Sequence, residues 1–292
     1  MTLAIEETQA KAAILAEALP YIQRFSGTRI LVKVGGELFD DGEAAKSLAY
    51  DLGFLRTVGI DVVLVHGGGP QITRAMQRFG KEAIFIEGQR KTDAETLELT
   101  AMVLLGDINR RLVSLLNSTG TKAIGLSGAD DNMLIVEQRD PELGFVGAVK
   151  NINTAPIKSL LSSGYVPVIA GLGVDQSGQL YNVNADSAAG KIAVAIGAEK
   201  FVLLTNVPGL YENFEDKGSL ISEIDLAGLI RLLSTGKVSQ GMIPKIEAIL
   251  TAVKAGIPRA HILDGRVRHA LLLEVFTKEG VGTMVRGAEG KQ

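Results

Sequence analysis

A lysine and two glycines at the end of an apolar run are the first residues that could do chemistry. Lys33 interrupts the β-branched run at 30–34, and Gly35 and Gly36 follow at once. Such a run is typical of a buried strand in a parallel sheet, and glycine lets backbone amides approach a ligand closely. Because ligands of open α/β sheets bind at the C-terminal edge of the strands, this arrangement suits an anion. A tight turn beside a solvent-reaching lysine explains the same residues equally well.

A second glycine turn repeats the arrangement. The apolar run at 61–65 leads into HGGGP at 66–70, in which three glycines expose their amides and the proline suits the first turn of a helix. Two such turns after two apolar strands favour a site for a phosphate or a carboxylate. Arg90 could clamp a carboxylate with both arms of its guanidinium, although a lone arginine is more often a surface residue.

Further polar residues stand at predicted helix starts. Asn182 and Asp186 flank the start of a helix that should run through Ile196. The helix dipole stabilises a carboxylate there even when it has no other role. Lys245 closes the segment GMIPK (241–245), which opens another helix, and a turn-rich loop at 205–211 follows an apolar strand.

These residues must be positioned by alternating strands and helices, a pattern that predicts a mostly parallel sheet with helices on both faces. Predicted strands cover 30–34, 61–65, 122–126, 133–137, 145–149, 166–170, 201–204, 259–263 and 283–286. Predicted helices cover 3–25, 42–56, 154–163, 186–196, 225–233, 241–255 and 267–276, and another starts at Pro70.

Two predicted helices carry further expectations. Thr92 and Glu95 have the spacing of a capping box, so a long helix should start there. Its expected buried face is Leu97, Ala101, Leu104, Leu105, Ile108, Leu112 and Leu115. Pro20 should kink the N-terminal helix, whose apolar stripe could pack on the body or on another subunit.

Composition excludes several classes of protein. The 292 residues suffice for one large or two coupled lobes, and 30 basic against 33 acidic residues disfavour a nucleic-acid binder. The absence of cysteine excludes disulfides, thiol catalysis and thiolate metal sites, and three histidines leave little for zinc. No apolar run has membrane-spanning length and no signal peptide is apparent. We therefore expect a soluble, cytoplasmic α/β protein.

Missing motifs narrow the chemistry. Neither the P-loop pattern GxxxxGK[ST] nor the dinucleotide pattern GxGxxG occurs. The HGGG segment matches the oxyanion loop of some esterases, but that reaction needs a GxSxG nucleophile turn. The nearest stretch, GLSGA at 125–129, lacks the final glycine, so the esterase interpretation is weak.

In combination, KVGG (33–36), HGGGP (66–70), GQRKTD (88–93), YNVNAD (181–186), TNVPGLY (205–211) and GMIPK (241–245) resemble the amino acid kinase family. The resemblance runs from Thr28 to about Arg286 and is greatest to the members that act on N-acetyl-L-glutamate. It implies a three-layer α/β sandwich with a central, mostly parallel sheet, preceded by a kinked N-terminal helix. It also implies ATP-dependent phosphorylation of the side-chain carboxylate of N-acetyl-L-glutamate, in arginine biosynthesis.

The resemblance also implies roles for individual residues. Lys33 and Lys245 would flank the transferred phosphoryl group, and Asp186 would orient both. The acceptor would be held by Gly68, Gly69, Arg90 and Asn182, with Arg90 on its α-carboxylate. The nucleotide would lie against Gly35, Gly36, Thr205, Asn206, Gly209, Leu210, Tyr211 and Met242. Mg²⁺ would be held mainly by the nucleotide phosphates, so no protein metal site is expected.

The two ends resemble the arginine-inhibited members, which are hexamers joined through their N-terminal helices. His261, Glu274 and Gly280 would then bind L-arginine, although a strand end, a helix surface and a turn account for them as well. The implied organisation is an oligomerisation helix at 1–27, an acceptor lobe at 28–197, and a nucleotide lobe with the regulatory segment at 198–292.

Some positions depart from the family's pattern. Glu37 follows KVGG, Gln89 and Lys91 flank Arg90, and Ser239-Gln240 precedes GMIPK. These departures keep two alternatives open: a kinase for a related acceptor such as carrier-linked aminoadipate, and a catalytically silent amino-acid sensor. The joint presence of Lys33, Asp186 and Lys245 argues against the sensor. A synthase of this fold would need an added acetyltransferase domain, for which the chain is too short.

Overall fold

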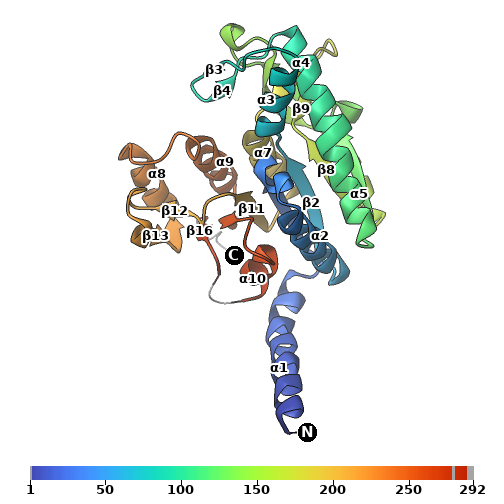
Figure 1. Ribbon diagram of the computed structural model, residues 1–292, viewed down its shortest axis with the longest axis vertical. Helices are drawn as coiled ribbons and strands as arrows, with labels where there is room; N and C mark the ends of the chain where they lie inside the picture. Colours follow the sequence, from blue (N-terminus) through green and yellow to red (C-terminus); the bar gives the residue numbers. More distant parts are fainter. Residues whose placement is uncertain (1, 278–279, 288–292) are drawn as a thin grey trace.

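The computed structural model describes residues 2–277 and 280–287. Its centre is an eight-stranded sheet, which confirms the predicted α/β architecture (Figure 1). Neighbouring strands are parallel except for one antiparallel pair, β15 with β16. In spatial order the strands are β14 (Glu223–Asp225), β16 (Thr283–Arg286), β15 (Arg259–Asp264), β11 (Lys200–Thr205), β1 (Arg29–Val34), β2 (Asp61–His66), β8 (Val166–Ala170) and β5 (Ala123–Ser127).

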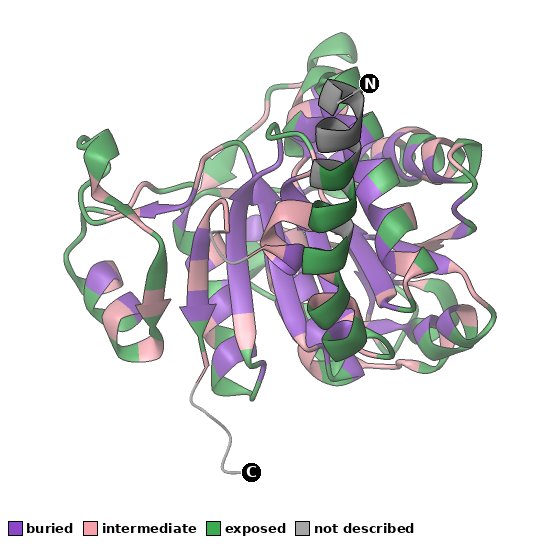
Figure 2. Ribbon diagram, turned by 90° about the horizontal axis from the view of Figure 1, so that it is seen from below, coloured by how far each residue is buried: buried purple, intermediate pink, exposed green. Residues whose placement is uncertain are grey.

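Both faces of this sheet are buried, because alternate side chains enter two separate hydrophobic clusters. Ile30 and Val32 of β1 belong to one cluster and Leu31 to the other. Figure 2 shows the buried strands between two layers of helices. One layer contains α2 (Gly42–Thr57), α3 (Gly69–Arg78), α4 (Ala94–Ala101), α5 (Arg110–Ser118) and α10 (Ala270–Phe276). The other contains α6 (Ala155–Ser162), α7 (Ala185–Ile196), α8 (Leu226–Ser234) and α9 (Ile243–Lys254).

Four short strands form a closed barrel that the sequence did not predict as a unit. They are β10 (Leu180–Val183), β7 (Val146–Ile152), β6 (Leu134–Gln138) and β9 (Leu172–Val174). Two further hairpins have two-residue strands, β3 (Phe85–Ile86) with β4 (Gln89–Arg90), and β12 (Leu210–Tyr211) with β13 (Leu220–Ile221). Strands this short carry too little alternation to be recognised from sequence.

The predicted capping box at Thr92 is wrong. The N-cap of α4 is Asp93, whose carboxylate accepts a hydrogen bond from the Thr96 amide at 2.8 Å. The Thr92 hydroxyl instead donates to the carbonyl of Arg90 at 2.9 Å. The helix start therefore lies one residue later than predicted.

The long helix is also interrupted by a π-helix, η2 (Met102–Asn109), between α4 and α5. A π-helix has wider turns, which rotate the residues that follow. Leu105, predicted to be buried, is consequently 38% exposed, and Leu116 is buried where Leu115 was expected. Leu104, Ile108 and Leu112 are buried as predicted.

The N-terminal helix α1 (Thr2–Phe25) projects from the body of the molecule (Figure 1). Pro20 lies within it. Near its C-terminal end, Tyr21 and Ile22 pack against the cluster that also contains α10. Farther out, Ile14 and Leu19 are 66% and 50% exposed, so the body does not cover these two residues of the apolar stripe.

Candidate active site

A cavity of about 540 Å³ opens at the carboxyl ends of β1, β2 and β11. That edge is where the sequence placed an anion site. The cavity brings together residues predicted for all three roles, catalytic, acceptor and nucleotide. Those lining it are Lys33, Gly35, Gly36, Gly68, Gly69, Arg90, Asn182, Asp186, Thr205, Asn206, Met242 and Lys245.

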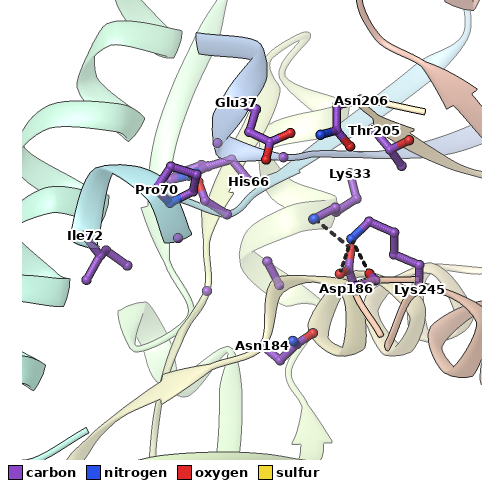
Figure 3. A pocket seen from close by; sticks show the side chains of 18 of the residues that line it. Lys33, Glu37, His66, Pro70, Ile72, Asn184, Asp186, Thr205, Asn206 and Lys245 are labelled. Carbon is purple, nitrogen blue, oxygen red and sulfur yellow. Dashed lines mark hydrogen bonds and ion pairs between the residues drawn. The ribbon is translucent and has the colours of Figure 1, made fainter. Parts of the chain in front are cut away.

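Three charged side chains from distant segments meet in this cavity (Figure 3). Asp186 Oδ1 lies 2.7 Å from Lys33 Nζ, and its Oδ2 lies 3.5 Å from Lys245 Nζ. The contact with Lys33 is an ion pair without hydrogen-bond alignment. Burial alone would raise the pKa of Asp186, but the two lysine charges outweigh burial and lower it. The carboxylate is therefore ionised at neutral pH.

Two helices that run in the same direction hold this cluster together. The side chain of Asn184 caps α7 by accepting a hydrogen bond from the Ser187 amide at 3.0 Å, which sets Asp186 in the first turn. Lys245 lies in the first turn of α9. The helices approach closely because Gly190 has no side chain, since a Cβ there would lie 2.8 Å from the Ala248 carbonyl oxygen.

Packing also explains why the two glycine turns need glycine. A Cβ at Gly68 would lie 2.4 Å from Ile108 Cδ1 and 2.9 Å from Leu104 Cδ2, both in the π-helix. A Cβ at Gly36 would lie 2.3 Å from Gln71 Oε1 and 3.1 Å from the Cα of Gly68. The two turns therefore touch one another, and both line the cavity that contains the two lysines.

His66, at the end of β2, is fully buried under the second glycine turn. Its Nδ1 lies 3.2 Å from the Gly67 carbonyl oxygen, and its Nε2 lies 3.0 Å from Nδ2 of Asn109. The Asn109 amide also donates to the Val168 carbonyl at 2.9 Å. With Asn109 as donor, Nε2 is the acceptor and the imidazole proton resides on Nδ1. Sequence reasoning missed Asn109, because it comes from the end of the π-helix, 43 positions away.

We expect the imidazole of His66 to stay neutral throughout the physiological pH range. Burial lowers the pKa of His66 to about 4, whereas an unfolded histidine titrates near 6.5. As the pH is lowered, the unfolded chain therefore binds the proton before the folded protein does. The free energy of unfolding should then fall by up to about 1.4 kcal/mol for each pH unit of acidification between pH 6.5 and pH 4. NMR titration, with the signal assigned through a His66→Asn variant, checks this. A midpoint near 6.5 contradicts it.

Arg90 presents its guanidinium to the cavity from β4. The side chain donates to the Gly69 carbonyl at 3.0 Å and to the Thr73 hydroxyl at 2.8 Å, lies 3.1 Å from Met76 Sδ, and stacks 4.8 Å from the ring centroid of Phe85. Its burial lowers the pKa of Arg90. No carboxylate in the described part of the chain pairs with it, so the charge remains available to an anionic ligand.

Asn182 is tied to the same region, because its amide donates to the Thr92 hydroxyl at 3.2 Å. The predicted nucleotide residues Gly209, Leu210 and Tyr211 lie outside the cavity lining, in and beside β12. Among the residues that depart from the family's pattern, Glu37, Gln89 and Ser239 line the cavity, whereas Lys91 and Gln240 do not. The unusual charge of Glu37 thus lies within the site.

The three residues predicted for the effector come together away from this cavity. His261 Nδ1 lies 2.7 Å from Glu274 Oε1, and Glu274 Oε2 accepts a hydrogen bond from the Val281 amide at 3.1 Å. A Cβ at Gly280 would lie 3.0 Å from Glu274 Oε2. Lys200 lies beside them, 4.9 Å above the ring of Phe25, and burial lowers its pKa to about 8. This cluster connects α10, β15 and the end of α1.

Within residues 2–277 and 280–287, no three carboxylate or histidine side chains cluster as metal ligands would. None of the helices in these ranges is long and apolar enough to cross a membrane.

A model of the amino acid kinase family matches residues 28–264. The chain belongs to the amino acid kinase family. Family relatives include acetylglutamate kinase from Thermoanaerobacter sp. (strain X514), 46% identical over 94% of this chain and 93% of its own length. The acetylglutamate kinase of Nitrosococcus oceani is 44% identical over 98% of this chain and 99% of its own. The chloroplastic acetylglutamate kinase of Arabidopsis thaliana is 46% identical over 95% of this chain and 80% of its own.

Solved structures agree with the family's fold. N-acetylglutamate synthase from Neisseria gonorrhoeae, complexed with coenzyme A and N-acetyl-glutamate, matches 96% of this chain with a TM-score of 0.84 and 26% identity. This chain spans 64% of the length of that synthase chain. Carbamate kinase from Giardia lamblia bound to AMP-PNP has a TM-score of 0.70 at 16% identity, and shares the fold alone.

Proposed function

We propose that this chain transfers the γ-phosphoryl group of ATP to the side-chain carboxylate of N-acetyl-L-glutamate, in arginine biosynthesis. The observation that carries the proposal is the buried cluster of Lys33, Asp186 and Lys245 beside two glycine turns in one cavity. The relatives named acetylglutamate kinase, at 44–46% identity over nearly the whole chain, support the choice of acceptor.

The reaction joins two anions, so the protein's main task is alignment and charge neutralisation. An oxygen of the acceptor carboxylate attacks the γ-phosphorus, the bond from phosphorus to the β,γ-bridging oxygen breaks, and ADP leaves. No proton has to be removed, because the attacking carboxylate is already ionised. Lys33 and Lys245 would stabilise the charge of the transferred group, and Asp186 would hold both ammonium groups in place.

Ligands would be divided between two lobes. The acceptor would lie in the lobe at 28–197, with its α-carboxylate on Arg90 and its other polar groups on Asn182 and the amides of Gly68 and Gly69. The nucleotide would lie in the lobe at 198–292, against Met242 and the loop at 205–211, with its phosphates on Gly35 and Gly36. Lysines and amides fit a nucleotide that carries its own Mg²⁺, and this ion would further neutralise the phosphates.

We expect Arg90→Ala to raise KM for N-acetyl-L-glutamate at least about 30-fold, because a partly desolvated charge pair would be lost. KM for MgATP should change little. Steady-state kinetics with each substrate varied in turn measures the difference. Arg90→Lys should recover only part of the loss, because lysine lacks the planar fork. Arg78→Ala, on the exposed side of α3, is the matched control, and an unchanged acceptor KM in Arg90→Ala removes the assigned role.

Regulation by L-arginine is part of the proposal. The ionised Glu274, next to His261 and Gly280, offers a carboxylate to a cationic effector. The structure of the N-acetylglutamate synthase from Neisseria gonorrhoeae has also been solved in complex with coenzyme A and L-arginine. Arginine binding is shown there for the synthase. The exposed side chains of Ile14 and Leu19 on α1 are compatible with a hexamer joined through these helices.

The test is ADP release from MgATP with N-acetyl-L-glutamate, trapping the acyl phosphate with hydroxylamine, with and without L-arginine. Acceptor-dependent turnover that arginine suppresses supports both the kinase and its regulation. Turnover that is insensitive to arginine retains the kinase and removes the effector role of His261, Glu274 and Gly280. The same assay with an N-acylated or carrier-linked aminoadipate tests whether the unusual residues Glu37 and Gln89 change which acceptor is phosphorylated. A folded protein without turnover on any acceptor would favour the sensor.

A further inference from the structure

The loop that leaves β11 is only partly exposed to the cavity. Thr205, Asn206 and Val207 line it, whereas Gly209 and Leu210 do not. Near the cavity the loop is folded by its own first residue, because the Thr205 hydroxyl accepts from the Val207 amide at 3.1 Å. The far end of the loop must therefore be fixed by something else.

That second anchor is Thr283, a fully buried residue in the last strand, β16. Its hydroxyl accepts a hydrogen bond from the Leu210 amide at 2.8 Å and donates one to the Ile221 carbonyl at 2.5 Å. Leu210 and Ile221 are directly paired between β12 and β13. One hydroxyl thus uses its donor and one acceptor site to tie this hairpin to the central sheet.

Two glycines show how closely the segments pack. A Cβ at Gly209 would lie 2.4 Å from Thr283 Oγ1 and 3.1 Å from its amide nitrogen. A Cβ at Gly282 would lie 3.1 Å from the Pro208 carbonyl oxygen and 2.1 Å from that of Ile262. The loop therefore lies directly against β16, and a small displacement of Thr283 cannot be absorbed by empty space.

We propose that Thr283 is a positioning residue for the nucleotide: through the amide of Leu210 it holds the loop at 205–211 in the conformation that receives ATP. This inference rests on the proposed location of the nucleotide. The segment TNVPGLY (205–211) contains the loop itself but not Thr283, the residue that holds it. Thr283 touches neither the cavity nor the three charged residues in it, so its effect should fall on one substrate only.

The test compares Thr283→Val, which keeps the shape and removes the hydroxyl, with Thr283→Ser, which keeps the hydroxyl. Thr283→Val leaves the Leu210 amide and the Ile221 carbonyl without their partner. KM for MgATP should rise about three- to tenfold, the range expected for loss of one buried hydrogen bond. KM for N-acetyl-L-glutamate should stay within twofold of the wild type. Thr283→Ser should restore most of the affinity for ATP.

Thr277→Val is the matched control, because the Thr277 hydroxyl donates only to the Leu273 carbonyl at the end of its own helix, at 2.6 Å.

Hydrogen exchange of residues 205–211, with and without MgADP, distinguishes failure of the role of Thr283 from failure of the proposed nucleotide site. Protection of the loop in the wild type, together with equal ATP affinity in wild type and Thr283→Val, overturns the role of Thr283 and keeps the site. No protection in the wild type overturns the nucleotide location and this inference with it. Equal increases in both KM values would indicate general destabilisation and also reject it.

Discussion

Replacing Lys33 with alanine is expected to lower kcat for phosphoryl transfer by about 10²- to 10³-fold, the cost of removing one preorganised charge from a developing transition state. Lys33 is buried near the end of β1, in the middle of the sheet. The variant should remain folded, because Asp186 keeps Lys245 as a partner at 3.5 Å. Acceptor-dependent ADP release, measured beside the circular dichroism spectrum, checks both statements.

Lys245→Ala should show a similar loss, since that lysine faces the same carboxylate from the first turn of α9. Lys150→Ala is the matched control, because Lys150 pairs with Glu137 on the outside of β7 and is half exposed. Its turnover should equal that of the wild type. If folded Lys33→Ala or Lys245→Ala protein turns over at nearly the normal rate, the assigned role of that lysine is wrong.

Asp186→Asn is expected to affect activity and stability together. An amide cannot offset the charge of Lys33, which would be left buried without a counter-ion. Breaking such a pair costs about 3–5 kcal/mol of unfolding free energy. The lysines would also lose their orientation, so kcat should fall about 10²-fold or more. Urea denaturation and steady-state kinetics measure the two effects, with Asp107→Asn, an exposed aspartate paired with Arg111, as the control.

A double variant separates the two effects. Lys33→Ala combined with Asp186→Asn removes the unpaired buried ammonium group as well as the carboxylate, so it should be more stable than Asp186→Asn alone. Its activity should not recover. Recovery of near-normal turnover in the double variant would mean that neither Lys33 nor Asp186 has the assigned catalytic role.

The central strands could be predicted because a strand buried on both faces is a nearly continuous apolar run. This holds for β1, β2, β8 and β11, and it is why the edge of the sheet where Lys33 and the glycine turns lie could be named in advance. Grouping them with Asp186 and Lys245 required the family resemblance. No local pattern connects three segments so far apart in the chain.

What could not be predicted depends on contacts across the fold. Thr92 looks like a helix cap, but its hydroxyl is engaged by Arg90 and by Asn182, 90 positions away. The π-helix rotates Leu105 outward and brings Asn109 to His66. Thr283 reaches Leu210 across 73 positions. The side chains of Thr92, Asn109 and Thr283 each have several possible hydrogen-bond partners, and only the packed structure selects among them.

The common direction of α7 and α9 has an electrostatic consequence for the approach of ligands. Each helix carries roughly half a positive charge at its first turn, and both first turns face the cavity that contains Lys33 and Lys245. The chain as a whole has a formal charge of −3. Screening confines the attraction to about 8 Å at physiological ionic strength, so an anion is drawn in only once it reaches the mouth of the cavity. An acidic protein can in this way capture acidic substrates without attracting polyanions over the rest of its surface.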